Sequence, residues 1–176
     1  MKGKFNILVE NNWISYQLEI KRKFKFTVIR GDSASGKSYF CNLINSGDSV
    51  RIECSVPIVV VQNRDMLEYY LEGSDRIIVF DEDSYLFKNI SLYSKKLISS
   101  NNYFIILSRS FLIGVPYSLK EIYKFSSRIV NNKTINSLTP IYNFSTKVDN
   151  LNGIVITEDT KSGNINGVSN EIFYNE

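Results

Sequence analysis

Hydrophobic positions along the chain form two kinds of run, and the difference between them predicts the order of strands and helices. The first thirty residues are β-rich and suggest strands at 5–10, 13–20 and 24–30, with a turn at Glu10-Asn11-Asn12. Later runs are continuously apolar, which is typical of strands buried on both faces; they lie at 56–61, 76–80 and 103–107. Helical spacing separates these runs at 37–45, 66–72 (with Asn63 or Asp65 as its cap) and 85–99. Strands that alternate with helices predict a parallel sheet built from βαβ units.

The pattern weakens after Arg109. A short helix is expected at 118–125, and edge or antiparallel strands are expected at 129–142 and 153–157. We therefore expect one α/β domain over 1–150, with 151–176 as a C-terminal strand and tail of the same domain.

Composition narrows the class of protein. The chain has 176 residues, of which 43% are hydrophobic and 22% are charged, as in ordinary globular proteins. It contains no histidine, which excludes Ser/His and Cys/His nucleophile pairs and His-ligated zinc. Cys41 and Cys54 are too few for a four-cysteine zinc site and indicate reduced thiols. No apolar run reaches the length of a membrane span, so we expect a cytoplasmic protein without membrane insertion.

One segment carries a specific chemical signal. Gly31-Asp32-Ser33-Ala34-Ser35-Gly36-Lys37-Ser38 fits the pattern G-x-x-x-x-G-K-[ST] at every position, between a predicted strand and a predicted helix. Such a loop directs backbone N–H groups at phosphates, its lysine reaches the β and γ phosphates, and its serine ligates Mg²⁺. The candidate residues for binding a nucleotide are therefore Gly31, Asp32, Ser33, Ala34, Ser35, Gly36, Lys37, Ser38 and Tyr39.

This loop resembles the Walker A motif of P-loop NTPases, and the run from Arg76 to Glu82 resembles their Walker B motif. The resemblance implies that Asp81 holds the Mg²⁺ shell together with Ser38, that Glu82 is the general base, and that Lys37 is catalytic. An acidic strand end that caps the next helix is the alternative reading of Asp81 and Glu82. The Asp-Glu pair resembles the Walker B ending of the AAA+, RecA and ABC branch of this superfamily. In that branch a strand beside the P-loop strand ends in a polar residue, the sensor, which contacts the γ phosphate or the attacking water. Ser108 is then the first sensor candidate and Arg109 the second. The alternative interpretation is a strand that simply ends in solvent, without a sensor.

The resemblance covers about residues 24–110, and the rest departs from it. There is no ABC signature sequence, no AAA+ helical lid and no obvious arginine finger, for which Arg128 is the candidate. The strands before the loop are similar only in architecture to ABC and SMC heads. The segment 153–159 resembles the opening of a TOPRIM nuclease domain, as in OLD-type nucleases, although an edge strand with an acidic turn is the simpler interpretation.

The resemblance implies a three-layer P-loop NTPase with a mainly parallel central sheet and antiparallel strands added at its N- and C-terminal ends. Its expected activity is slow, Mg²⁺-dependent ATP hydrolysis coupled to DNA or to a protein assembly, of a phage or mobile element, with a homo-oligomer as a further option. The sequence leaves open a nucleotide-dependent switch with little turnover, a small-molecule kinase, and the ATPase part of an OLD-type nuclease. It also leaves open the choice between ATP and GTP.

Overall fold

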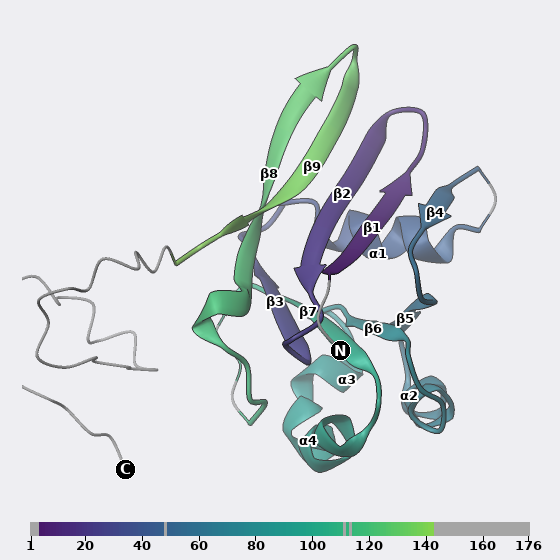
Figure 1. Cartoon of the computed structure of the whole chain (residues 1–176), viewed down its shortest axis with the longest axis vertical. Coiled ribbons are helices and arrows are strands. Elements are labelled where there is room, and N and C mark those ends of the chain that lie inside the picture. Colours follow the sequence, from purple (N-terminus) through teal and green to yellow (C-terminus); the bar gives the residue numbers. More distant parts are fainter. Residues whose placement is uncertain (1–3, 48, 111, 113, 143–176) are drawn as a thin grey trace, which may run out of the picture. The chain divides into compact units, whose positions relative to one another are not determined.

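Nine strands form one mixed sheet in the computed structural model, which describes residues 4–47, 49–110, 112 and 114–142 (Figure 1). The strands are β1 (Lys4–Glu10), β2 (Ile14–Lys21), β3 (Phe26–Arg30), β4 (Arg51–Glu53), β5 (Ile58–Val61), β6 (Ile77–Phe80), β7 (Tyr103–Ser108), β8 (Ile122–Val130) and β9 (Lys133–Pro140). The helices are α1 (Lys37–Asn45), α2 (Arg64–Leu71), α3 (Tyr85–Lys88) and α4 (Ile90–Ser99), with a 3₁₀ turn η1 (Leu119–Glu121). The expected α/β class is confirmed.

The parallel half of the sheet positions the candidate site. Strands β8, β3, β7, β6 and β5 are neighbours in this order, and every pair among them is parallel. The strands predicted at 24–30, 56–61, 76–80 and 103–107 are therefore parallel as expected. Strand β7 lies between β3 and β6, so the strand predicted to end in a sensor is beside the strand that precedes the glycine-rich loop. The segments that follow β3, β6 and β7 consequently leave the sheet at one common edge.

The other half of the sheet differs from the expected arrangement. Hairpins β1–β2 and β8–β9 are antiparallel, but β2 pairs with β9 in parallel, and both hairpins join the sheet on the β3 side. An edge or antiparallel strand was predicted at 129–142; strand β9 lies inside the sheet and is antiparallel to β8, so the antiparallel alternative holds. Strand β4, which was not predicted, pairs with β1 and forms one margin, while parallel strand β5 forms the other. The sheet is mixed because the hairpin β8–β9 connects the parallel strands to the N-terminal hairpin.

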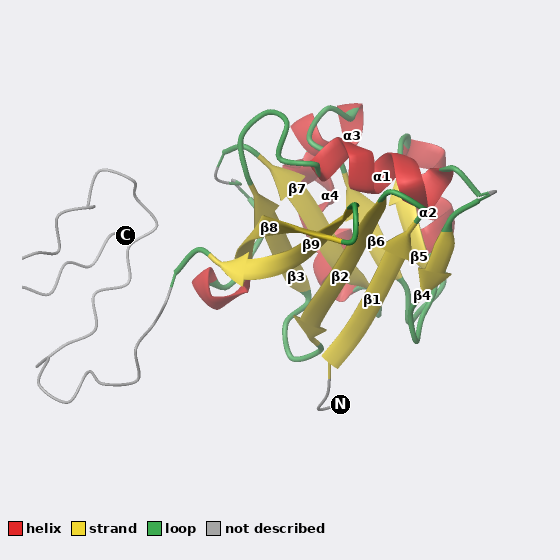
Figure 2. Ribbon diagram, turned by 90° about the horizontal axis from the view of Figure 1, so that it is seen from above, coloured by secondary structure: helices red, strands yellow, loops and turns green. Residues whose placement is uncertain are grey.

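Two apolar cores lie on the two faces of the sheet. Along β6 the side chains alternate: Ile77 and Val79 pack in the core on the α1 side, and Ile78 and Phe80 pack in the core on the side of α2, α3 and α4. The sheet curls strongly (Figure 2): helix α1 contacts both β1 and β5, although these strands are far apart in strand order. The curl also brings the ring of Phe5 on β1 within 4.6 Å of the ring of Tyr103 on β7, edge to face.

Two predicted helices end differently from the expectation. The segment 85–99 is divided at Asn89, whose backbone (φ −114°, ψ 17°) leaves the helical region between α3 and α4. The segment 118–125 forms only the turn η1 before β8 begins, because Ser118 Oγ accepts from the Lys120 N–H and closes a short turn. Asn63 caps α2 by accepting from the Met66 N–H at 2.9 Å, which decides between the two predicted caps. The predicted strand at 153–157 and the tail lie outside the described residues.

A buried carboxyl group at the end of η1 predicts an unusual pH dependence. Glu121 is 0% exposed, its Oε2 accepts from the Tyr123 hydroxyl at 3.4 Å, and its Oε1 has no partner. Burial raises the pKa of Glu121, against the smaller opposing effect of the Lys21 charge. The unfolded carboxyl ionises first, so the folded state loses stability as pH rises above the ordinary glutamate pKa. We expect Glu121→Gln to be more stable than the wild type at pH 8, with the difference closing toward pH 4, in urea unfolding.

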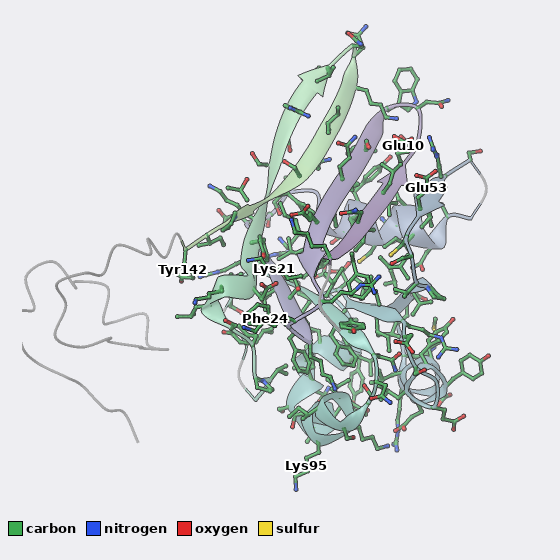
Figure 3. The ribbon with its side chains drawn as sticks, viewed as in Figure 1. Glu10, Lys21, Phe24, Glu53, Lys95 and Tyr142 are labelled. Atoms are coloured by element: carbon green, nitrogen blue, oxygen red, sulfur yellow. The ribbon has the colours of Figure 1, made fainter. Side chains whose placement is uncertain are left out.

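Glu10 provides a control of opposite sign. Its carboxylate accepts from Lys133 Nζ at 2.7 Å, and this hydrogen bond is the main reason that its pKa is lowered. A carboxyl group with a lowered pKa stabilises the folded state at pH values above the ordinary glutamate pKa. This stabilisation is lost as the pH falls. Glu10→Gln should therefore be less stable than the wild type at pH 8, with this difference closing at low pH. Figure 3 shows Glu10 near the β1–β2 turn and Lys21 at the opposite end of β2. If both variants changed with pH in the same direction, burial would not explain the behaviour of Glu121.

Candidate functional site

The glycine-rich loop joins the end of β3 to the start of α1. Its backbone turns sharply, with positive φ at Ala34 (64°) and Gly36 (85°), and the Gly31 N–H donates to the Ser108 carbonyl at 3.1 Å. The Tyr16 hydroxyl donates to the Gly36 carbonyl at 2.7 Å, and a Cβ at Gly36 would lie only 2.9 Å from that hydroxyl oxygen. Glycine at 36 is therefore required both by the left-handed backbone and by the close approach of Tyr16.

The Lys37 ammonium lies inside the turn of its own loop. The side chain is 6% exposed, and Nζ donates to the Gly31 carbonyl at 2.5 Å and to the Asp32 carbonyl and Ser35 Oγ at 3.0 Å each. A buried cation satisfied only by neutral oxygens favours an anion as a ligand, because phosphate oxygens make stronger charge-assisted hydrogen bonds. The remaining loop residues and the start of α1 are more open: Asp32, Ser33, Ala34, Ser38 and Tyr39 are exposed.

Asp81 follows β6 and lies close to α1. The charge of Asp81 contributes, after burial, to raising the pKa of the Cys41 thiol. Residues three apart share a side of a helix, so Asp81 faces the side of α1 that carries Ser38. The Asp81 Oδ1 atom is buried and has no hydrogen-bond partner. A buried carboxylate oxygen without a partner, on the side of α1 that carries Ser38, fits a hard divalent cation such as Mg²⁺.

The described residues contain no group of three or more His, Cys, Asp or Glu side chains that could hold a metal ion. A cation at Ser38 and Asp81 would therefore need further oxygen ligands from a bound phosphate or from water. This is the usual coordination of Mg²⁺ in nucleotide sites, where the protein supplies few ligands.

The two residues after Asp81 contact Arg109, which follows β7. Arg109 Nε is 2.5 Å from Glu82 Oε1, and Arg109 Nη2 is 3.8 Å from Asp83 Oδ1. The Glu82 side chain is 13% exposed, whereas the Arg109 side chain is 51% exposed. The predicted general base and the second sensor candidate therefore form an ion pair at the common edge of the parallel strands.

Ser108, the first sensor candidate, occupies a different environment. It is 0% exposed, and its Oγ donates to the Ser110 carbonyl at 2.6 Å and accepts from the Ser110 N–H at 3.1 Å. The hydroxyl group thus closes the turn after β7. Arg128, the candidate arginine finger, lies exposed on β8.

The sequence pattern did not predict the roles of two residues that support the loop and the turn after β7. Tyr16, in the second strand of the chain, holds the Gly36 carbonyl, and Arg30 Nε donates to the Arg109 carbonyl at 3.2 Å. Only the position of Arg30, directly before the loop, gave a signal that could have pointed to a role. Tyr16 belongs to a strand whose pattern indicates only packing.

In the part of the chain that the structure describes, no helix combines the length and the apolar character needed to cross a bilayer. No protein-family model, no curated protein and no solved structure matches the chain. The geometry of the loop, the two carboxylates and Arg109 is therefore the basis for assigning a function.

Proposed function

We propose that the protein binds ATP with Mg²⁺ and hydrolyses it slowly, on a three-layer P-loop NTPase fold. The observation that carries this proposal is the position of Lys37, whose buried ammonium is held by neutral oxygens inside a loop between a parallel strand and a helix. Packing of α1 on one face of the sheet and of α2, α3 and α4 on the other supports the three-layer arrangement. In open α/β sheets, ligands bind at the carboxyl ends of the strands, where this loop lies.

Binding would use the loop and the first turn of α1. The backbone N–H groups around Ala34 and Gly36 and the positive end of the α1 dipole attract phosphate oxygens. Lys37 would exchange its contacts with the Gly31 and Asp32 carbonyls for contacts with the β and γ phosphates. Ser38 and Asp81 would hold Mg²⁺, which neutralises charge on the phosphates and orients them.

Hydrolysis would use Glu82. Its carboxylate follows the strand that is separated from the P-loop strand only by β7, so it can accept a proton from a water molecule that attacks the γ phosphate. We expect slow turnover from the chain alone, because Glu82 is paired with Arg109. A macromolecular partner, DNA or a protein assembly, or a second copy of the chain, would then stimulate the reaction.

A nucleotide-dependent switch with little turnover is the second candidate, and the same ion pair favours it. A general base that stays paired with Arg109 would allow binding and conformational change without hydrolysis. Tight retention of ATP that DNA does not affect would support the switch, whereas phosphate release stimulated by DNA would support the coupled ATPase.

The test is equilibrium ATP binding and phosphate release with Mg²⁺, with and without DNA. Lys37→Ala should weaken ATP binding about 10- to 100-fold, because one charged hydrogen bond contributes about 1.5–3 kcal/mol. Glu82→Gln should bind ATP but release phosphate about 10²- to 10⁴-fold more slowly than the wild type. Lys95→Ala, which removes an exposed lysine on α4, is the matched control and should change neither quantity. Failure of the wild type to bind nucleotide, or equal binding by Lys37→Ala, would contradict the proposal.

A further inference from the structure

Arg109 contacts one of the two carboxylate oxygens of Glu82, the proposed general base. The distance from Arg109 Nε to Glu82 Oε1 is 2.5 Å, and the Glu82 side chain is only 13% exposed. The guanidinium thus covers the carboxylate oxygen that it contacts and keeps a water molecule from reaching it. The pair must therefore separate, or rearrange, before a water molecule can contact this oxygen.

The backbone of Arg109 is connected to the glycine-rich loop. Arg30 Nε donates to the Arg109 carbonyl at 3.2 Å, and the Gly31 N–H donates to the carbonyl of the preceding residue, Ser108, at 3.1 Å. The Ser108 hydroxyl fixes the turn that follows β7. These contacts fix the main chain of Arg109 beside the loop, while its half-exposed side chain can change partners.

We propose that Arg109 binds Glu82 in the nucleotide-free protein and moves to the terminal phosphate when a nucleoside triphosphate binds. The exchange rests on the proposed function, since it needs a triphosphate in the loop. Strand β7 ends between the loop after β3 and the carboxylates after β6, so Arg109 lies between its two partners. A guanidinium binds phosphate with paired, charge-assisted hydrogen bonds, and a terminal phosphate carries more charge than one carboxylate.

The exchange makes the site discriminate between triphosphate and diphosphate. A nucleoside diphosphate has no γ phosphate, so Arg109 stays on Glu82 and the base stays blocked. A triphosphate attracts Arg109 and frees the carboxylate for the attacking water. Arg109 thus couples the presence of the cleavable phosphate to the release of the group that promotes its hydrolysis.

The two side chains can be separated by a double-mutant cycle on binding alone. The affinities for ATPγS and for ADP, both with Mg²⁺, are measured by isothermal titration for the wild type, Glu82→Gln, Arg109→Ala and the double variant. Glu82→Gln removes the nearer of the two carboxylates that compete for Arg109, so it should raise the ratio of ATPγS affinity to ADP affinity about fivefold or more. Arg109→Ala should lower that ratio by a similar factor, and adding Glu82→Gln to it should produce no further change.

Two further variants exclude a merely structural effect. Arg109→Lys retains one charge and should restore part of the ratio, whereas a residue needed only for folding would lower both affinities together. Arg64→Ala removes an arginine that is 70% exposed and lies 3.7 Å from Glu68 on α2, so it should leave the ratio unchanged.

The outcomes distinguish the exchange from the proposed function. If Glu82→Gln raises the ratio equally with and without Arg109, the exchange is overturned, although the protein still binds nucleotide. If Arg109→Ala leaves the ratio at the wild-type value, the exchange is likewise overturned. If the wild type binds neither ATPγS nor ADP, the proposed function itself fails. A raised ratio in Glu82→Gln that disappears in the double variant supports the exchange.

Discussion

Phe40→Ala should lower the free energy of unfolding by about 3–5 kcal/mol, the usual cost of removing a buried phenylalanine side chain. Phe40 is 0% exposed and lies in α1, directly after the glycine-rich loop. Its ring centroid is 5.1 Å from that of Tyr16 on β2 and 5.9 Å from that of Phe125 on β8. The side chain therefore joins α1 to both hairpins on the inside of the curl, and its truncation leaves a cavity between them.

Urea unfolding at neutral pH measures this loss. Leu92→Ala is the control, because Leu92 is 79% exposed on α4 and its truncation should change the free energy of unfolding by about 0.5 kcal/mol or less. A loss below about 1 kcal/mol for Phe40→Ala would mean that the site can collapse around the smaller side chain. The contact between α1 and the hairpins would then contribute little to the stability of the curled sheet.

The parallel strands could be predicted because they are buried on both faces. Segments such as 77–80 and 103–108 are continuous apolar runs, and each pairs with neighbours on both sides. The hairpin β8–β9 could not be placed in the same way. Most of β8 beyond Tyr123 is exposed or half-exposed, so its sequence has neither an apolar run nor a clear alternation. The other strand of the hairpin, β9, pairs in parallel with β2, and this pairing joins residues more than a hundred positions apart.

The candidate site shows the same division between local and distant information. The loop from Gly31 to Ser38 is contiguous, and its spacing alone predicts how the backbone turns at Gly36. The ion pair of Glu82 with Arg109 and the hydrogen bond of Tyr16 to Gly36 join separate elements. The sequence predicted that Glu82 and Arg109 follow the ends of two parallel strands, and therefore lie at one edge of the sheet. It did not show that their side chains face each other.

Asn102→Ala should lower the free energy of unfolding by about 2–4 kcal/mol, because it leaves three partly buried backbone groups without the partner that the side chain supplies. Asn102 is 1% exposed, and its Oδ1 accepts from the Arg76 N–H at 3.1 Å. Its Nδ2 donates to the Tyr70 carbonyl at 3.3 Å and to the Gly73 carbonyl at 3.0 Å, at the end of α2. One amide thus joins α2 to the starts of β6 and β7.

The starts of β6 and β7 lie at the edge of the sheet opposite the glycine-rich loop, since these strands run parallel to β3. Asn102→Ala should therefore weaken the fold and leave the affinity for Mg²⁺-ATP, measured well below the unfolding transition, within about twofold of the wild type, because distant sites without shared partners act nearly independently. Asn101→Ala is the matched control: Asn101 is exposed and adjacent, and its truncation should change neither quantity. A large loss of ATP affinity in Asn102→Ala would show that the two edges of the parallel sheet are energetically coupled. In that case Asp81 and Glu82 would depend on how β6 is anchored at its start, and the site could not be treated as a local arrangement at the strand ends.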